Sequence, residues 1–215
     1  MSKEFFEVLR LTSAFSVIIP LIFALLFFAR LTKVQRKLTL LLLVVLIVEI
    51  TTNVMWYHEM NNLLIYHVYT VVEFLLFLNI FKEVLSKLIT LLGVVLLGTG
   101  FSLFSVIISL FYQRIYEFNS IAITVLSVSM ILIALASFYS LLKEHSYSKV
   151  ERNPIFWISA GILIYFSGNL ILFYINNALN LTLEESYIIW GMHAVVNIVL
   201  ILFYTRAIWV HPAKE

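Results

Sequence analysis

The sequence predicts an all-α membrane protein, a bundle of seven transmembrane helices with its amino terminus outside the cytoplasm and its carboxyl terminus in the cytoplasm. Three observations lead to this fold class. The 215 residues are 62% hydrophobic and only 12% charged. Seven apolar runs of helical length are separated by short polar stretches. Lysine and arginine are distributed very unevenly between the two sets of connecting segments.

The composition is the first of these observations. Soluble domains carry about 25% charged residues, twice the fraction found here. A soluble chain of this size could not hide so much apolar surface, so that surface must face lipid. A net charge of +2 gives no sign of a nucleic-acid partner. The chain has no cysteine, which excludes disulfides and thiol catalysis, and all twelve of its acidic residues are glutamate.

The apolar runs define the expected elements. A bilayer core of about 30 Å needs about 20 apolar residues in a helix. Strands with open edges would leave backbone groups unpaired in lipid, and barrel strands are shorter and alternate in polarity. The runs are therefore read as helices. They form a single domain that covers residues 1–215, with spans at about 13–31, 38–57, 62–81, 88–111, 119–142, 155–174 and 186–209.

The orientation follows from the positive charges, which accumulate on the cytoplasmic side of membrane helices. Three lie on the amino-terminal side, namely Lys3, Arg10 and Arg114. The other eleven lie on the opposite side: Arg30, Lys33, Arg36, Lys37, Lys82, Lys87, Lys143, Lys149, Arg152, Arg206 and Lys214. This split predicts that the carboxyl terminus is cytoplasmic.

Two acids, Glu49 and Glu73, are the only formal charges in the predicted spans away from their inner ends, where Arg30 and Arg206 lie. At about 1.5 Å per residue, each lies near the middle of the membrane. No Lys or Arg is expected in the same membrane layer to pair with them, and a charge there is costly unless it is protonated, paired or hydrated. We expect both carboxyls to face the bundle interior, to stay mostly protonated, and to bond to His67 and to Asn53 or Asn197.

Other polar residues recur at helical spacing beside these acids. Their faces converge in the outer half of spans two, three, six and seven. They predict a polar ligand-binding cavity that opens outward, lined by Glu49, Asn53, Trp56, Tyr66, His67, Glu73, Asn169, His193 and Asn197. The alternative for each single residue is a hydrogen bond between neighbouring helices, which polar groups in membrane bundles commonly make.

Several kinds of chemistry can be tested against these residues. A retinal pigment needs a lysine inside its last span, and this chain has none there. The ceramidase and adiponectin-receptor superfamily has a His-x3-His pair on its last helix, where this chain has His193 followed by Asn197, and it uses an aspartate that this chain lacks. We therefore predict no catalytic residues, no bound metal and no cofactor. Haem ligation by His67 and His193 remains an alternative.

Two stretches carry a resemblance to known proteins: residues 62–74 (NLLIYHVYTVVEF) and residues 153–161 (NPIFWISAG). They resemble a family of small uncharacterised bacterial seven-span membrane proteins, mainly over spans two, three, six and seven. The layout is also similar to the seven-helix sensor modules that precede histidine kinase domains. The resemblance implies a multi-pass protein of the bacterial inner membrane, which is the plasma membrane.

The expected function is therefore that of a receptor-like or accessory membrane protein. It would bind a small or lipidic ligand in the outer cavity, among membrane lipids, and act through a membrane or cytoplasmic protein partner. One alternative is a proton- or cation-coupled transporter that uses Glu49 and Glu73, and another is an intramembrane hydrolase. Transporters often show inverted repeats and broken helices, whereas here only Pro20 interrupts a span and no repeat is visible.

Overall fold

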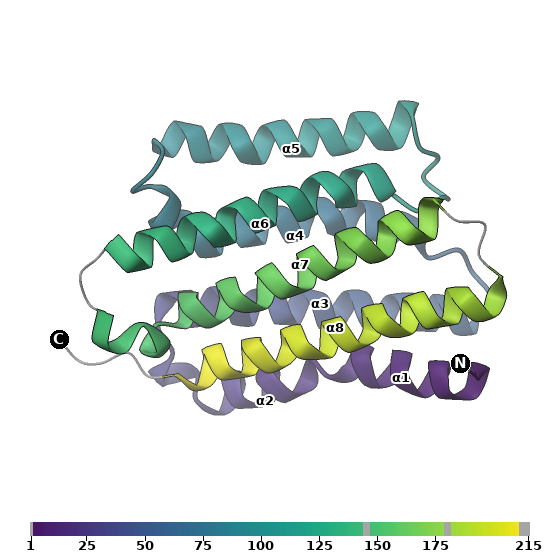
Figure 1. The fold of residues 1–215 in the computed structure, drawn as a ribbon, viewed down its shortest axis with the longest axis horizontal. Helices are drawn as coiled ribbons and strands as arrows, with labels where there is room; N and C mark the ends of the chain where they lie inside the picture. The colour runs from purple at the N-terminus through teal and green to yellow at the C-terminus, as the bar shows by residue number, and fades with distance from the viewer. Residues whose placement is uncertain (1, 144–146, 179–181, 211–215) are drawn as a thin grey trace.

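The computed structural model describes residues 2–143, 147–178 and 182–210, and every regular element within them is a helix (Figure 1). The elements are α1 (Lys3–Phe15), α2 (Ile18–Leu26), η1 (Phe28–Arg30), α3 (Lys33–Tyr57), α4 (Leu63–Leu85), α5 (Leu91–Phe111), α6 (Ser120–Lys143), η2 (Tyr147–Arg152), α7 (Pro154–Ala178) and α8 (Leu183–Trp209). In these ranges, seven helical segments are long and apolar enough to cross a membrane, with α1 and α2 together forming the first. The predicted number of helical segments long and apolar enough to span a membrane is confirmed.

The first span is the one that differs most from its prediction. It begins at Lys3, not near residue 13, and runs to Leu26. Hydropathy misses the early turns because they contain Glu7 and Arg10, yet these two side chains pair at 3.0 Å along the helix. The side chain of Ser2 accepts a hydrogen bond from the Phe5 amide and so caps the helix start.

The break between α1 and α2 follows from Pro20. Proline has no amide hydrogen, so it cannot donate to the carbonyl of Ser16 four residues earlier. The Ile19 amide instead bonds to the Ser16 carbonyl at 3.1 Å, in a tighter turn. The predicted interruption of this span at Pro20 is confirmed.

The seven candidate spans alternate in direction, so the bundle has two ends (Figure 1). We call them the N end, where α1 begins, and the C end, where α8 ends. Helix α8 packs mainly on α7 and on α1 and α2, and α7 packs on α6. Helix α4 packs on α3, α5 and α6, and α5 has its main contacts with α4 and α6 alone. The bundle is thus a ring of helices with α5 at its edge.

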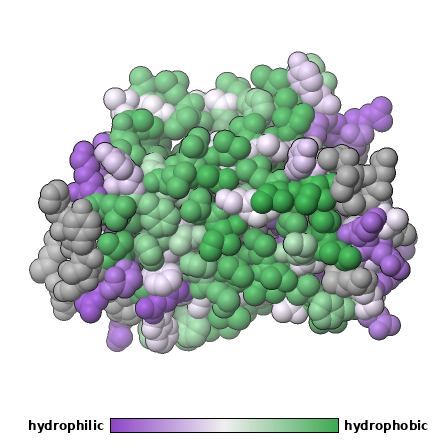
Figure 2. All heavy atoms as spheres, in the orientation of Figure 1, coloured by the Kyte–Doolittle hydropathy of each residue, from purple (hydrophilic) through white to green (hydrophobic). Residues whose placement is uncertain are grey.

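The outer surface is apolar between the two ends. Figure 2 shows a broad hydrophobic belt with hydrophilic residues gathered at both extremities. Large apolar side chains such as Leu26 and Leu103 are more than half exposed on this belt. Such a surface requires an apolar surrounding, as the composition predicts.

The core of the bundle is apolar and tightly packed toward the C end, where a hollow of about 210 Å³ lies beside Gln35. Interior residues there, such as Leu38 and Leu42 on α3 and Phe81 on α4, have no exposed surface. Gln35 joins α3 to α8 at this end, because its amide Nε2 donates to the carbonyls of Ala207, Ile208 and Val210 at 2.9, 3.0 and 2.7 Å. We call this contact the Gln35 clamp.

The N-end half of the interior is different. Beyond Leu42, the only fully buried residue of α3 is Thr52. The interior positions of this half carry polar side chains that keep part of their surface accessible, including Glu49, Asn53, Tyr66 and Glu73. The two halves of the bundle therefore differ in both packing and polarity.

Candidate functional site

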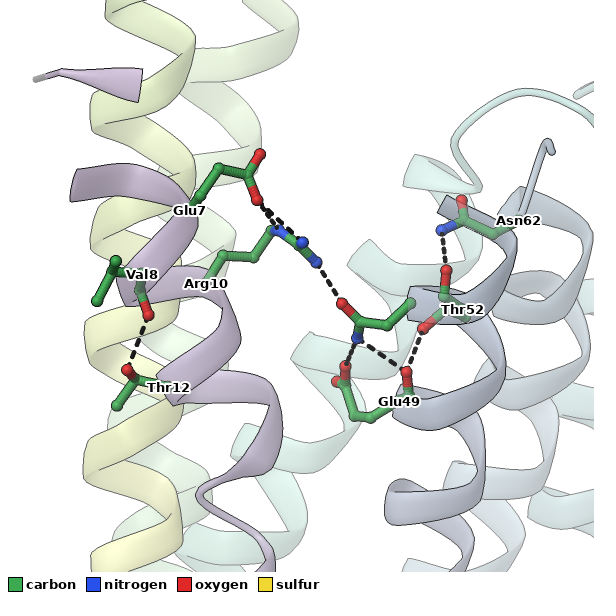
Figure 3. Close-up of polar contacts among 8 residues, drawn as sticks. Glu7, Val8, Arg10, Thr12, Glu49, Thr52 and Asn62 are labelled. Carbon is green, nitrogen blue, oxygen red and sulfur yellow. Dashed lines mark hydrogen bonds and ion pairs between the residues drawn. The ribbon is translucent and has the colours of Figure 1, made fainter. Parts of the chain in front are cut away.

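The first part of the site is a chain of hydrogen bonds between α1 and α3 (Figure 3). Arg10 Nη1 donates to Asn53 Oδ1 at 2.6 Å. Asn53 Nδ2 in turn donates to the Glu49 carbonyl at 2.8 Å and reaches the carboxyl Oε2 of Glu49 at 3.5 Å. Glu7 Oε2 lies 3.0 Å from both Nε and Nη2 of the same guanidinium, and it accepts a hydrogen bond from Nε. We call Glu7, Arg10, Asn53 and Glu49 the Arg10 network.

Arg10 corrects the expectation that no basic residue shares a membrane layer with the two acids. It lies inside the first candidate span, and its long side chain reaches from α1 to α3. Its guanidinium also lies 5.6 Å from the centroid of the Trp56 ring, a cation–π distance. The sequence did indicate that the helix includes Arg10. Glu7 and Arg10 lie three residues apart, and opposite charges at that spacing stabilise a helix.

The expected bond between Asn53 and Glu49 is confirmed by this network. Close by, Asn62 Nδ2 donates to the Thr52 carbonyl at 3.2 Å, which ties the start of α4 to the last turns of α3. This contact fixes the turn between the two helices that carry Glu49 and Glu73.

The second part of the site surrounds Glu73 on α4. The Tyr69 hydroxyl, one turn earlier, donates to Glu73 Oε1 at 3.1 Å. Tyr165 on α7 and Tyr204 on α8 lie within electrostatic range of the same carboxyl. Glu73 thus has a hydrogen-bond donor on its own helix, and tyrosines of α7 and α8 interact with it electrostatically.

The two parts share one interior. Tyr165 also lies within electrostatic range of Glu49 and Tyr66, and Tyr66 lies within range of Glu49 and Arg10. The interior between α3, α4, α7 and α8 therefore carries two carboxyls and several phenol hydroxyls, with the Arg10 guanidinium at its N-end side. The protonation state of the two carboxyls stays a prediction.

A third polar contact lies between α7 and α8. His193 Nδ1 and Asn169 Oδ1 are 2.8 Å apart, so these two predicted site residues meet directly. The His193 ring also contacts the rings of Tyr165, Phe173 and Trp190, with centroids 5.8–5.9 Å apart. The imidazole is held in place by neighbours on its own helix and on α7.

Two predicted site residues lie elsewhere. His67 is buried on the opposite side of α4, where its ring nitrogens bond to Ser109 Oγ at 2.7 Å and to the Glu117 carbonyl at 2.9 Å. Asn197 donates to Ser13 Oγ on α1 at 3.0 Å. The expected bonds from these residues to Glu49 or Glu73 are therefore wrong. The reason is that α4 and α8 each pack against helices on several sides, and periodicity does not say which face meets which neighbour.

Some functional candidates were missed by the sequence pattern. Tyr69 had a signal, since it lies four residues before Glu73 and such pairs meet on a helix. No pattern in the sequence relates Tyr204 or Tyr165 to Glu73, because the three residues lie on different helices. Trp56 remains mostly exposed and contributes to the site only through Arg10.

The described residues contain no group of three His, Cys, Asp or Glu side chains that could hold a metal ion. His67 and His193 contact different helices and have no partner in common. Both imidazoles therefore serve contacts between helices in this arrangement.

Comparisons with known proteins find no relative. No protein family, no curated protein and no solved structure shows a significant match to this chain. The functional argument therefore depends on the geometry of the interior.

Proposed function

We propose that this chain is a receptor-like or accessory multi-pass protein of the bacterial inner membrane, with its N end outside the cytoplasm. It binds a small polar or lipidic ligand in the N-end interior and acts through a membrane or cytoplasmic protein partner. The observation that carries this proposal is the Arg10 network, which places a cation and a carboxyl in a partly accessible polar interior.

The difference between the two ends supports a binding role. At the C end, the apolar core and the Gln35 clamp leave no exposed surface on residues such as Leu38 and Leu42. A ligand that enters from the N end would meet the Arg10 network first. A few well-placed polar groups in a largely apolar surrounding are typical of small-molecule sites.

A second candidate function is cation-coupled transport. One observation favours it: Glu73 lies midway along α4 among phenol hydroxyls, with Tyr69 as its one hydrogen-bond donor in the described ranges. Carboxyls at such depth often mark ion pathways. Transport would require the C end to open, which the Gln35 clamp opposes in this conformation.

Access to the interior can be tested directly, because the chain has no native cysteine. We expect Asn53→Cys and Glu49→Cys to react with a membrane-impermeant methanethiosulfonate reagent added outside intact cells. Leu42→Cys on the same helix should stay unreactive, because it is fully buried and an apolar surrounding suppresses the reactive thiolate. Wild-type protein provides the unlabelled background. Asn53→Cys and Glu49→Cys that both resist labelling would refute an interior accessible from outside.

The orientation can be tested with a reporter that is active only outside the cytoplasm. We expect a reporter fused after Glu215 to be silent and one inserted after Glu59, in the turn between α3 and α4, to be active. The reason is that the helix ends at the C end carry most of the positive charges, including Arg30, Lys33 and Arg206. The reverse pattern of reporter activity would overturn the proposed orientation.

A further inference from the structure

We propose that the hollow beside Gln35, at the C end, binds the headgroup of an anionic phospholipid. The guanidinium of Arg30 holds the lipid phosphate, and the acyl chains lie along the exposed apolar face of α2. This site lies at the opposite end of the bundle from the N-end interior, so it goes beyond the proposed function. Three observations support it: the size and place of the hollow, a guanidinium without a partner, and an apolar surface that continues into the membrane.

The hollow lies between α2, α3 and α8, where membrane spans end. Its volume is about 210 Å³, and its lining includes Arg30, Gln35 and Trp209. The first candidate span ends at Leu26 and the last at Trp209, so the hollow lies at the level of the lipid headgroups. Pockets that hold a whole small molecule measure about 300–1,000 Å³. A hollow of this size therefore takes one part of a larger molecule, such as the headgroup of a lipid.

The guanidinium of Arg30 is the charged group of the hollow. Arg30 is exposed, and its side chain has no hydrogen bond or ion pair within the described residues. Arg36 places a second guanidinium against the same short helix, η1. It reaches the Ala29 carbonyl at 3.5 Å and lies 5.4 Å from the centroid of the Phe28 ring.

The charge around the hollow has one sign. None of the residues that line it is acidic, and residues 30–37 contain four basic residues and no acid. Basic pockets between membrane helices bind the headgroups of anionic lipids on the cytoplasmic side of the membrane. Arginine suits a phosphate because its guanidinium can donate two parallel hydrogen bonds to it. A lipid phosphate would thus supply Arg30 with the acceptor that the surrounding residues lack.

The wall of the hollow is aromatic and continues into the membrane. The Trp209 ring packs edge-on against Phe23 and Phe27, with centroids 5.4 and 6.4 Å apart. Next to these phenylalanines on α2, Ile22 and Leu26 share one helical face and are 52% and 71% exposed. The acyl chains of a lipid seated in the hollow can follow this face. A free phosphate would gain nothing from it, which favours a lipid as the occupant.

The test is thermal unfolding of the purified full chain in a non-ionic detergent at constant ionic strength. The protein is titrated with dioleoyl phosphatidylglycerol, with dioleoyl phosphatidylcholine or with inorganic phosphate. We expect a saturable rise in Tm of about 3–6 °C at ten times Kd with phosphatidylglycerol alone. Phosphatidylcholine has the same acyl chains and a phosphate, but its choline group cancels the charge. Inorganic phosphate supplies the anion without acyl chains.

Three variants tie the response to Arg30. Arg30→Gln removes the charge from an exposed side chain, so it should fold with the wild-type Tm and lose the rise. Arg30→Lys keeps the charge but not the two parallel hydrogen bonds, so its rise should be weaker. Arg152→Gln is the matched control and should keep the full rise, because Arg152 is exposed at the same end, on η2, and does not line the hollow.

The proposal is overturned if phosphatidylglycerol gives no saturable rise or if phosphatidylcholine gives an equal one. An equal rise with inorganic phosphate also overturns it, because the site would then take a free anion. The same holds if Arg30→Gln keeps the wild-type response, or if Arg152→Gln loses it to the same extent, because the response would then follow total charge. A rise specific to phosphatidylglycerol that Arg30→Gln abolishes and Arg152→Gln keeps supports the lipid site.

Discussion

Gln35→Leu is expected to lower the free energy of unfolding by about 3 kcal/mol, because buried carbonyls left without a donor cost about 1–3 kcal/mol each. Gln35 is 2% exposed, and its side-chain amide donates hydrogen bonds to the carbonyls of Ala207, Ile208 and Val210. Leucine fills a similar volume but donates nothing. The measurement is the unfolding midpoint in denaturant of the protein in detergent micelles.

The effect of the Gln35 clamp on stability can be measured separately from a second role of Gln35, which is to cap the start of α3. Gln35 Oε1 accepts from the Thr32 amide at 2.8 Å and so completes a capping box at the start of α3. Thr32→Ala removes this cap and should cost only about 1 kcal/mol. Gln35→Glu keeps the acceptor for the cap but turns a carboxylate toward the carbonyls of α8, so it should cost at least as much as Gln35→Leu. If Gln35→Leu costs no more than Thr32→Ala, the clamp contributes nothing beyond the cap.

Gly161→Ala is the second change with a large expected effect, a loss of about 1–3 kcal/mol from overpacking. Helices α7 and α8 approach closely here, and a Cβ at position 161 would lie 2.8 Å from Phe203 Cβ and 3.1 Å from Leu200 Cδ1. Phe203 Cβ is bonded to the backbone, so it can move only if the helix moves. Thermal unfolding of the purified variant gives the size of the effect.

Gly100→Ala on α5 is the matched control. A Cβ at that position would have no heavy atom within 4 Å apart from its chain neighbours and the backbone of its own helix. Alanine is the better helix former by about 1 kcal/mol, so this substitution should leave the stability unchanged or raise it. The two glycine substitutions are thus expected to have opposite signs. Equal effects at both positions would mean that the contact between α7 and α8 is looser than the geometry indicates.

Local features of the sequence were sufficient to predict most of the helices. Six of the seven spans lie within a few residues of their predicted ranges, because hydropathy and helix length are properties of one segment at a time. Capping is equally local, as with the Thr182 side chain that accepts from the Glu185 amide at 3.3 Å at the start of α8. The exception is the first span, where Glu7 and Arg10 lower the local hydropathy although they pair with each other.

The sequence by itself determined the class of fold, the approximate helix limits and the helical face shared by Glu49 and Asn53. Only the tertiary structure decided that Arg10 reaches Asn53, 43 residues away, that His67 points toward α5, and that Asn197 meets Ser13 on α1. The physical reason is that periodicity fixes which side chains share a face of one helix, within a few residues of chain. The rotation of each helix about its axis, and the neighbour each face meets, depend on packing between segments far apart in sequence.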